Sequence, residues 1–293
     1  MHKYTILIPS FNDWECLDLL IPNINKTLKN LNEDVSILII NDASTIKNNL
    51  SFKNLDNLRK IEIINLKKNV KAQKAVASGL YYLKQNNFKG GVIVMDADGQ
   101  DDPDDIQAII KKSKNNIEKT ILVYRLRRKD NFIFKMFYQF FLLITLIFTF
   151  KYMRFGAFSY LHSNSFDKIL STKDVNLAYP AALEKHFKER DRIYANKKER
   201  LAGSSKNNYL SLIHYGLKII SVFRFRMIFN SIIIIFVLIF SHNFFIFPDL
   251  LLLFFSACIL IFNMLVFSIH NKANKEDYND LKDNIKNLSS LKN

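Results

Sequence analysis

The chain has 293 residues, with 42 Lys and Arg against 27 Asp and Glu, so its net charge is +15. Gly and Pro are scarce, which excludes a collagen-like or low-complexity chain. The two cysteines, Cys16 and Cys258, cannot build a disulfide framework, and neither stands in a CxxC pair. This argues against a disulfide-rich secreted scaffold and a cysteine zinc site. The length allows one or two domains.

Polar and apolar residues are segregated along the chain. From Met227 to Ile269 the only formal charge is Asp249. Leu250–Ile269 is long enough to cross a bilayer, and Met227–Phe247 is a weaker candidate because polar residues interrupt it. With a break at Ser241–Asp249, these segments predict a helical hairpin in the membrane. The alternative is a pair of buried core helices, but these seldom lack a charged face over such a length.

Basic residues gather beside the apolar segments. Residues 111–154 carry a net charge of +9 and residues 185–226 a net charge of +8. An anionic membrane surface accounts for this better than nucleic acid, since cytoplasmic flanks of membrane spans collect Lys and Arg. We therefore expect a multi-pass protein of the inner or cytoplasmic membrane whose large N-terminal part and tail face the cytoplasm. The flanking residues are Arg224, Arg226, Lys272 and Lys275.

The first 125 residues alternate between short apolar runs and helical patterns, which predicts a doubly wound α/β sheet with ligands at the carboxyl ends of its strands. The predicted strands are Tyr4–Ile8, Val35–Ile40, Ile61–Leu66, Val92–Met95 and Thr120–Tyr124. The predicted helices are Glu15–Leu31, Ala72–Gln85 and Pro103–Lys114. The tail from Asn271 is expected to be solvated or to lie on the surface.

Polar motifs follow three of these strands: IPSFND (8–13), INDAS (40–44) and MDADGQDDP (95–103). Asp96 and Asp98 are two residues apart, so on an extended chain their carboxylates point the same way. Such a pair can share a Mg²⁺ or Mn²⁺ that also binds a diphosphate. The alternative is an acidic turn that caps the next helix, a role we expect for the later acidic residues. These are Asp101, Asp102, Asp104 and Asp105.

These motifs, together with NVKAQKAVASGL (69–80), resemble in order and spacing the family 2 glycosyltransferases, which have the glycosyltransferase A fold, a Rossmann-like α/β fold. They are most similar to the membrane-anchored branch that includes dolichyl-phosphate mannose synthases and polyprenyl-phosphate glucosyltransferases. Residues 199–223 resemble the Arg-x-x-Gly-x-Ser-Lys loop and membrane-surface helix of that branch. The resemblance covers about residues 4–226. It implies a nucleotide-sugar domain with interfacial amphipathic helices and a C-terminal two-helix transmembrane hairpin.

The resemblance implies a role for several residues of this chain. Pro9, Phe11 and Asp13 would line the nucleoside pocket, and Asp42 would hold the base. Asp96, Asp98 and Gln100 match the metal and diphosphate motif, and the loop that closes over the phosphates is matched by Arg200, Ser204 and Lys206.

Arg125, Arg127 and Arg128 follow the fifth strand, and any of them can face a phosphate. Ordinary membrane-facing charge accounts equally well for two of the three.

Two motifs depart from the family pattern. The usual Asn-x-Gly-Lys reads Asn69-Val70-Lys71-Ala72, closer to a variant with Gln73 and Lys74. The usual Asp-x-Gly-x-Phe-Arg reads RFGAFSYL at 154–161, without the Asp or the second Arg. Because this region faces the acceptor in the family, the acceptor stays open.

Residues 132–150 carry only one charge, Lys135. A single crossing there would put Asp98 and Arg200 on opposite sides of the membrane, so the segment should lie in the interface or re-enter the membrane from one side. Of these two, we predict an interfacial pair of helices. The predicted parts are a nucleotide-sugar-binding part, interfacial helices with the acceptor and phosphate loop, the transmembrane hairpin and a cytoplasmic tail. They cover residues 1–130, 131–226, 227–269 and 270–293.

The predicted reaction is a metal-dependent, inverting transfer of a sugar from a nucleotide sugar, with Asp98, Arg200 and Lys206 as catalytic residues. A polyprenyl phosphate acceptor would need no general base, whereas a hydroxyl of a lipid or glycan would need one, and Asp101 or Asp102 would be nearest. Two other classes stay open: a membrane nucleotidyltransferase and a non-catalytic nucleotide-sugar-binding protein. A homo-oligomer is possible, and no nucleic-acid partner is expected.

Overall fold

The computed structural model describes most of the chain, as two compact units. The described residues are 3–126, 132–204, 209–242, 248–274 and 283–292. The first unit comprises residues 1–129, 154–206 and 277–293. The second comprises residues 130–153 and 207–276. The predicted segment 131–226 thus contributes to both units.

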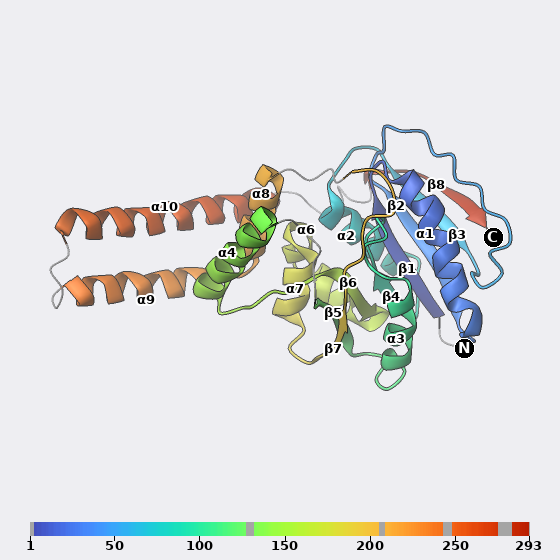
Figure 1. The fold of residues 1–293 in the computed structure, drawn as a ribbon, viewed down its shortest axis with the longest axis horizontal. Helices are drawn as coiled ribbons and strands as arrows, with labels where there is room; N and C mark the ends of the chain where they lie inside the picture. Colours follow the sequence, from blue (N-terminus) through green and yellow to red (C-terminus); the bar gives the residue numbers. More distant parts are fainter. Residues whose placement is uncertain (1–2, 127–131, 205–208, 243–247, 275–282, 293) are drawn as a thin grey trace. The chain divides into compact units, whose positions relative to one another are not determined.

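The described part of the first unit forms an eight-stranded sheet with the order β7-β5-β6-β4-β1-β2-β3-β8 (Figure 1). The strands are β1 (Lys3–Ser10), β2 (Asp34–Asn41), β3 (Ile61–Leu66), β4 (Gly91–Val94), β5 (Thr120–Arg125), β6 (Phe155–His162), β7 (Arg190–Ala195) and β8 (Ile285–Lys292). The helices are α1 (Trp14–Thr27), α2 (Ala72–Gln85), α3 (Asp104–Ser113), α5 (Phe166–Leu170), α6 (Asp174–Leu177) and α7 (Tyr179–His186), with 3-10 turns η1 (Leu28–Asn30) and η2 (Ser163–Ser165).

The predicted α/β core is confirmed. β1 pairs in parallel with both β2 and β4, and β2 pairs in parallel with β3. Tyr4, Ile6 and Ile8 of β1 pack in one core with apolar residues of α1 and α3. Leu7 faces the other side, where a Cβ on Gly79 of α2 would lie 2.5 Å from its Cδ1. Helices therefore cover both faces of the sheet, as its continuously apolar strands require.

Two strands depart from the parallel pattern, and neither was predicted. β6, which contains most of the segment RFGAFSYL, runs antiparallel between β4 and β5. β8 pairs antiparallel with β3, so the end of the tail extends the sheet. Five consecutive residues of β8, 286–290, are exposed, so neither face of the strand is buried along this stretch.

The described part of the second unit is helical. Its helices are α4 (Phe132–Thr149), α8 (Tyr209–Val222), α9 (Arg224–His242) and α10 (Asp249–Asn274). α4 is one continuous helix, so the expectation of a pair of helices over 132–150 is wrong. Ile220, Met227 and Val266 form a small core that joins α8, α9 and α10. Phe148 of α4 packs on Phe262 of α10 with ring centroids 4.7 Å apart.

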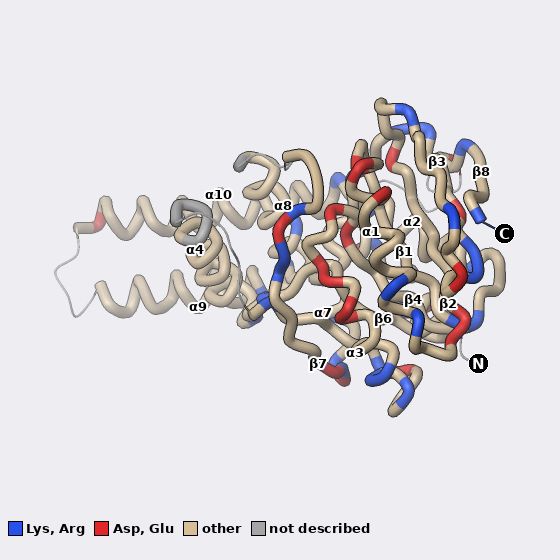
Figure 2. The backbone as a smooth tube through the Cα atoms, turned by 45° about the vertical axis from the view of Figure 1, so that its right-hand side comes forward, with Lys and Arg blue, Asp and Glu red and all other residues tan. Residues whose placement is uncertain are grey.

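α9 and α10 are long and apolar enough to cross a membrane, judged by length and composition. They correspond to the two predicted spans, and part of the predicted break, residues 243–247, lies outside the described residues. Figure 2 shows hardly any charge along either helix. Most of their large apolar side chains are exposed, among them Phe236, Leu253 and Met264.

Candidate active site

Three loops with predicted site residues leave the same edge of the sheet. β4, β1 and β2 are parallel neighbours, so their carboxyl ends lie side by side. Asp96 follows β4, Asp13 follows β1, and Asp42 follows β2. The strand order reverses between β1 and β4, and α/β sheets bind their ligands at such a reversal.

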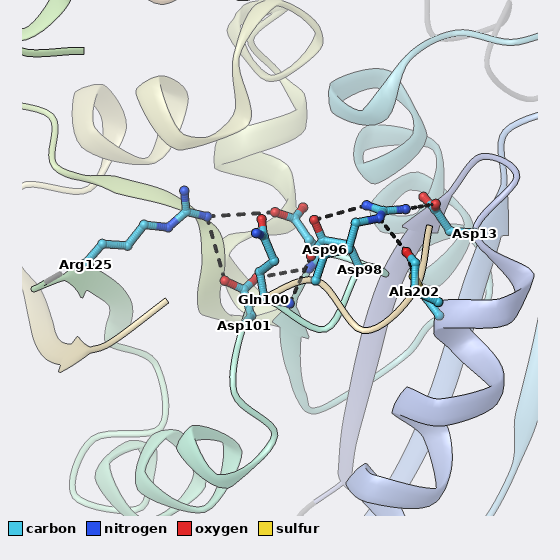
Figure 3. A network of polar contacts seen from close by, with 9 residues as sticks. Asp13, Asp96, Asp98, Gln100, Asp101, Arg125 and Ala202 are labelled. Atoms are coloured by element: carbon cyan, nitrogen blue, oxygen red, sulfur yellow. Dashed lines mark hydrogen bonds and ion pairs between the residues drawn. The ribbon is translucent and has the colours of Figure 1, made fainter. Parts of the chain in front are cut away.

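Three carboxylates, those of Asp96, Asp98 and Asp101, crowd at this edge (Figure 3). The Arg125 guanidinium, from the end of β5, has its Nη2 3.8 Å from Oδ2 of Asp96 and 3.7 Å from Oδ1 of Asp101. The backbone N–H of Asp96 donates to Oδ2 of Asp101 at 3.1 Å. Burial raises the pKa of all three carboxyls, and their mutual repulsion adds to it, while Arg125 lowers the pKa of Asp96 and Asp101. An additional cation would therefore be favoured here.

Gly156 of β6 makes room for Arg125. A Cβ at this position would lie 2.4 Å from Nη2 and 2.7 Å from Cζ of Arg125, closer than any side chain can approach. The antiparallel strand β6 therefore brings bare backbone against the guanidinium and leaves it beside the carboxylates.

The segment 196–204 crosses over the Asp96–Gln100 motif. The N–H of Leu201 donates to the carbonyl of Asp98 at 3.1 Å, and the N–H of Lys198 donates to the carbonyl of Gln100 at 2.9 Å. Gly99 has φ +73°, and a Cβ there would lie 2.3 Å from Cδ1 of Leu201. Glycine thus supplies both the turn and the space that let this segment lie against the motif.

Arg200 joins this segment to two of the strand-end carboxylates. Its Nη1 lies 3.4 Å from Oδ2 of Asp98, its Nη2 pairs with Oδ1 of Asp13, and its Nε donates to the carbonyl of Ala202 at 2.8 Å. Figure 3 shows Asp13 and Ala202 on one side of the cluster and Arg125 on the other. Two guanidinium groups therefore flank the three carboxylates.

Asp42 holds the loop that precedes α2. Its two carboxylate oxygens accept the N–H groups of Val70 and Lys71 at 2.6 and 2.8 Å, and its carbonyl accepts from the Asn69 side chain at 3.1 Å. Burial raises the pKa of Asp42, and the two N–H bonds lower it. This carboxylate therefore fixes the backbone of the loop, whatever else it contacts.

Lys71 stores backbone strain in this loop. Its φ of 71° and ψ of 157° belong to a region that almost only glycine occupies, at a cost of about 1–3 kcal/mol for other residues. The usual Asn-x-Gly-Lys motif has its glycine at this position. Lys71 thus adopts a backbone conformation that glycine would adopt without strain.

Lys71→Gly should raise the free energy of unfolding by about 1 kcal/mol, because it relieves this strain while the backbone N–H that binds Asp42 remains. Denaturant unfolding of the purified protein measures the change. Lys67→Gly, at an exposed position of the same loop, is the control and should lower stability by a few tenths of a kcal/mol. Destabilisation by Lys71→Gly would contradict the assignment of strain.

The carboxylates fit a metal ion that is shared with a ligand. Among the described residues there is no group of three or more His, Cys, Asp or Glu side chains placed to hold a metal by themselves. Mg²⁺ is usually held by one or two carboxylates together with substrate phosphates, rather than by a cage made only of protein. Asp96 and Asp98 offer such a pair of hard oxygen ligands, and burial, with a smaller contribution from a neighbouring carboxylate, raises the pKa of each.

Most of the predicted site residues lie on this edge of the sheet. Asp13, Asp96, Asp98, Arg125 and Arg200 form one network, and Gln100 lies within it (Figure 3). The remaining predicted residues contribute less: Pro9 is buried in β1, Phe11 is half-buried after it, Ser204 is exposed, and Lys206, Arg127 and Arg128 lie outside the described residues.

Sequence analysis misassigned Asp101 and gave Asn12 no separate role. Asp101 was expected to cap α3, but α3 begins at Asp104, and Asp101 is 5% exposed beside Arg125. The turn at Gly99 brings Asp101 back toward Asp96, which the spacing alone does not reveal. Asn12, with φ 55°, accepts the N–H groups of Thr45 and Ile46 at 2.8 and 3.0 Å and so ties the β1 loop to the β2 loop. In the sequence, the only indication of this role was that Asn12 lies within the motif IPSFND.

Comparison with known families decides the class of the protein. The sequence pattern of glycosyl transferase family 2 matches residues 5–171, more than half of the chain. The chain belongs to glycosyl transferase family 2. The matched residues include β1 to β6 and all of the strand-end motifs. Residues 5–171 thus form a glycosyltransferase domain, of the kind that transfers a sugar from a nucleotide sugar, and the predicted enzyme class is confirmed for this domain.

Relatives of this family 2 chain are similar over parts of their length. An uncharacterized glycosyltransferase of Synechocystis is 30% identical over 47% of this chain and 43% of its own length. The putative glycosyltransferase CsbB of Bacillus subtilis is 23% identical over 73% of this chain and 64% of its own. Glucosyl-3-phosphoglycerate synthase of Mycobacterium tuberculosis, solved with Mg²⁺ and uridine diphosphate, is 10% identical with a TM-score of 0.48, over 77% of this chain and 79% of that one. The chain spans less than half the length of the first relative.

Proposed function

We propose that this protein transfers a sugar, with inversion, from a nucleotide sugar to a membrane-bound acceptor, polyprenyl phosphate. The observation that carries the proposal is the carboxylate cluster at the strand reversal, flanked by two arginines. A nucleotide diphosphate brings negative charge and phosphate oxygens to such a site, and the arginines can pair with them. We also propose that the protein belongs to the polyprenyl-phosphate branch of the family.

On the donor side, Pro9, Phe11, Asp13 and Asp42 are proposed to bind the nucleoside, and Gln100 the diphosphate. Mg²⁺ or Mn²⁺ bound by Asp96 and Asp98 would supply charge neutralisation for the leaving diphosphate. Arg200, at present paired with Asp13 and Asp98, would turn to the phosphates when a donor binds. Arg125, held against Gly156, would add a second fixed positive charge. Ser204 and Lys206 are proposed to complete the same loop.

The structure favours a phosphate acceptor over a hydroxyl acceptor. Asp101 and Asp102, the two carboxylates that could serve as a general base for a hydroxyl, are both engaged in other contacts. Asp101 lies beside Arg125 and accepts the N–H of Asp96. Asp102 pairs with Lys198 at 2.7 Å and accepts the N–H of Asp104. A hydroxyl acceptor needs a carboxylate that takes its proton, whereas a phosphate is already ionised near neutral pH. These ion pairs support an acceptor that needs no base.

A membrane location is proposed from α9 and α10, whose exposed apolar side chains suit hydrocarbon. Arg224 and Arg226 begin α9, and Lys272 lies in the last turn of α10, so both basic ends belong to the same side of a hairpin. The positive-inside rule assigns that side to the cytoplasm. Nucleotide sugars would then reach the site from the cytoplasm.

The decisive experiment is a transfer assay with membranes that contain the purified protein. Several radiolabelled nucleotide sugars are offered together with polyprenyl phosphate or with the unphosphorylated polyprenol. We expect label in lipid only with the phosphate, in a product that mild acid cleaves as a sugar phosphodiester. Transfer to the polyprenol or to a glycan would establish the hydroxyl alternative instead. Donor binding without transfer to any acceptor would establish the binding-module alternative.

Cysteine labelling should report the proposed topology. In a Cys258→Ser background, a cysteine at Asp249 should react with an impermeant maleimide in intact cells, because the loop between the spans faces outward. A cysteine at Lys151 should react only after the membrane is opened. Reaction of the Lys151 position in intact cells would mean that 132–150 crosses the membrane and would contradict the interfacial assignment of α4.

A further inference from the structure

The strand β8 is joined to the loop after β3 by a single buried residue. Asn284 is 4% exposed and directly precedes β8. Its backbone carbonyl accepts the N–H of Lys67 at 2.8 Å. Its side chain accepts the N–H of Lys68 at 3.1 Å and donates to the carbonyl of Lys68 at 3.3 Å. Asn284 therefore binds both polar groups of one peptide backbone residue, as another strand would.

The loop held by Asn284 is the same loop that Asp42 holds. Lys68 is followed by Asn69, whose side chain donates to the carbonyl of Asp42, and then by Val70 and Lys71, whose N–H groups bind the Asp42 carboxylate. The loop is thus fixed from two directions, by Asn284 at residues 67–68 and by Asp42 at residues 69–71. The described structure has no helix or strand between the end of β3 at Leu66 and the start of α2 at Ala72.

We propose that Asn284 is a positioning residue for the donor nucleotide, acting through the 67–71 loop on Asp42. The inference rests on the proposed role of Asp42 in the nucleoside pocket. Lys71 holds a conformation that favours glycine, so the loop has a reason to relax away from Asp42. The Asn284 contacts hold the first half of the loop in place and so restrict this relaxation. Residues at the far edge of the sheet therefore set how often the nucleoside pocket is formed.

The expected effect follows from the population of the formed pocket. When only a fraction of the molecules has a binding-competent loop, the apparent Kd rises by the inverse of that fraction. Asn284→Ala removes both hydrogen bonds that the side chain makes with Lys68. The population of the formed loop should fall accordingly, and the Kd should rise by about tenfold, equivalent to about 1.4 kcal/mol.

The test measures binding of uridine diphosphate and guanosine diphosphate, each with Mg²⁺, to the full-length protein in detergent by calorimetry. With the nucleotide that binds the wild type, Asn284→Ala should raise the Kd about tenfold. In steady-state assays it should raise KM for the nucleotide sugar and change kcat less than twofold. In an Asp42→Asn background, Asn284→Ala should change the Kd less than twofold, because both residues act through one loop.

Two control variants lie on the same strand. Asn287→Ala removes an exposed amide in β8 and should leave the Kd unchanged. Lys292→Ala removes the contacts of Nζ with the carbonyls of Leu55 and Leu58 at the other end of β8. Lys292→Ala should therefore weaken the attachment of β8 without changing any contact of the 67–71 loop. An equal rise in Kd for Lys292→Ala and Asn284→Ala would overturn the proposal, since the strand would then act only on general stability.

Hydrogen exchange gives a readout that does not depend on turnover. The amides of residues 67–71 should exchange faster in Asn284→Ala, and nucleotide should slow exchange at 67–71 and at 284–285 in the wild type. If Asn284→Ala does not fold, the exchange rates of the wild type with and without nucleotide test the proposal. Slower exchange at 67–71 alone, without slower exchange at 284–285, would overturn it. A folded Asn284→Ala with an unchanged Kd would do the same. Nucleotide binding without sugar transfer would instead overturn the proposed function alone.

Discussion

Asp98→Asn should lower the rate of sugar transfer by at least about a thousandfold while the protein remains folded. The amide removes one of two carboxylates that are proposed to bind a divalent cation with the donor diphosphate. The Asn side-chain oxygen can still accept the N–H of Gln100, as Oδ1 of Asp98 does at 3.0 Å. The substitution also relieves repulsion with Asp96, so the unfolding temperature should not fall. A transfer assay at saturating donor, with thermal unfolding in parallel, measures both.

The matched control is Asp18→Asn, which removes an exposed carboxylate from α1 and should leave the rate unchanged. Treatment of the wild type with EDTA should abolish transfer, and Mg²⁺ or Mn²⁺ should restore it. Full activity in EDTA, or in Asp98→Asn, would remove the metal from the mechanism. Asp96→Asn should behave like Asp98→Asn if both carboxylates are ligands.

Arg200→Ala should lower turnover by on the order of a hundredfold, the effect expected when one electrostatic contact with developing charge is lost. The guanidinium pairs with Asp13 and Asp98, close to where the proposed diphosphate would lie. Three contacts from one planar group suit Arg better than Lys. Arg200→Lys should therefore recover only part of the lost rate. Rates at saturating donor and acceptor separate turnover from binding.

Lys198→Ala is the control for Arg200, because it removes a positive charge from the same segment. Lys198 pairs with Asp102 rather than with Asp98, and its side chain is 54% exposed. Its loss should change turnover less than about threefold, since exposed ion pairs contribute little. A near-normal rate in Arg200→Ala would exclude this arginine from the site. An equal loss in Lys198→Ala would point to the net charge of the segment instead.

The sequence predicted the parallel core and the residues that meet at its edge. Continuously apolar runs correspond to β1 to β5, because strands covered on both faces need no polar alternation. Once these strands are parallel, the residues that follow them must meet at one edge. Asp13, Asp42 and Asp96 are brought there by topology alone. The two apolar helices α9 and α10 were equally predictable, because length and absence of charge define them.

The remainder depends on contacts between residues distant in the sequence. β6 enters the sheet between strands that precede it by about 30–70 residues, and no local pattern reports this pairing. β8 is polar and exposed, so its strand character comes only from the free edge of β3. The strain at Lys71 follows from the hydrogen bonds between its loop and Asp42, and the burial of Asp101 follows from the turn at Gly99. The spacing of residues along the chain predicts neither feature.

The position of β8 in the chain has a consequence for biosynthesis. β3 is complete at residue 66, but its partner strand spans residues 285–292 and follows both apolar helices. At typical translation rates of roughly 5–20 residues per second, the interval is on the order of tens of seconds. Throughout it the β3 edge of the nascent protein is unpaired, and unpaired edges promote aggregation. Completion of the sheet therefore comes after synthesis of both apolar helices, so a chain whose synthesis stopped within α10 would have an open sheet edge at β3.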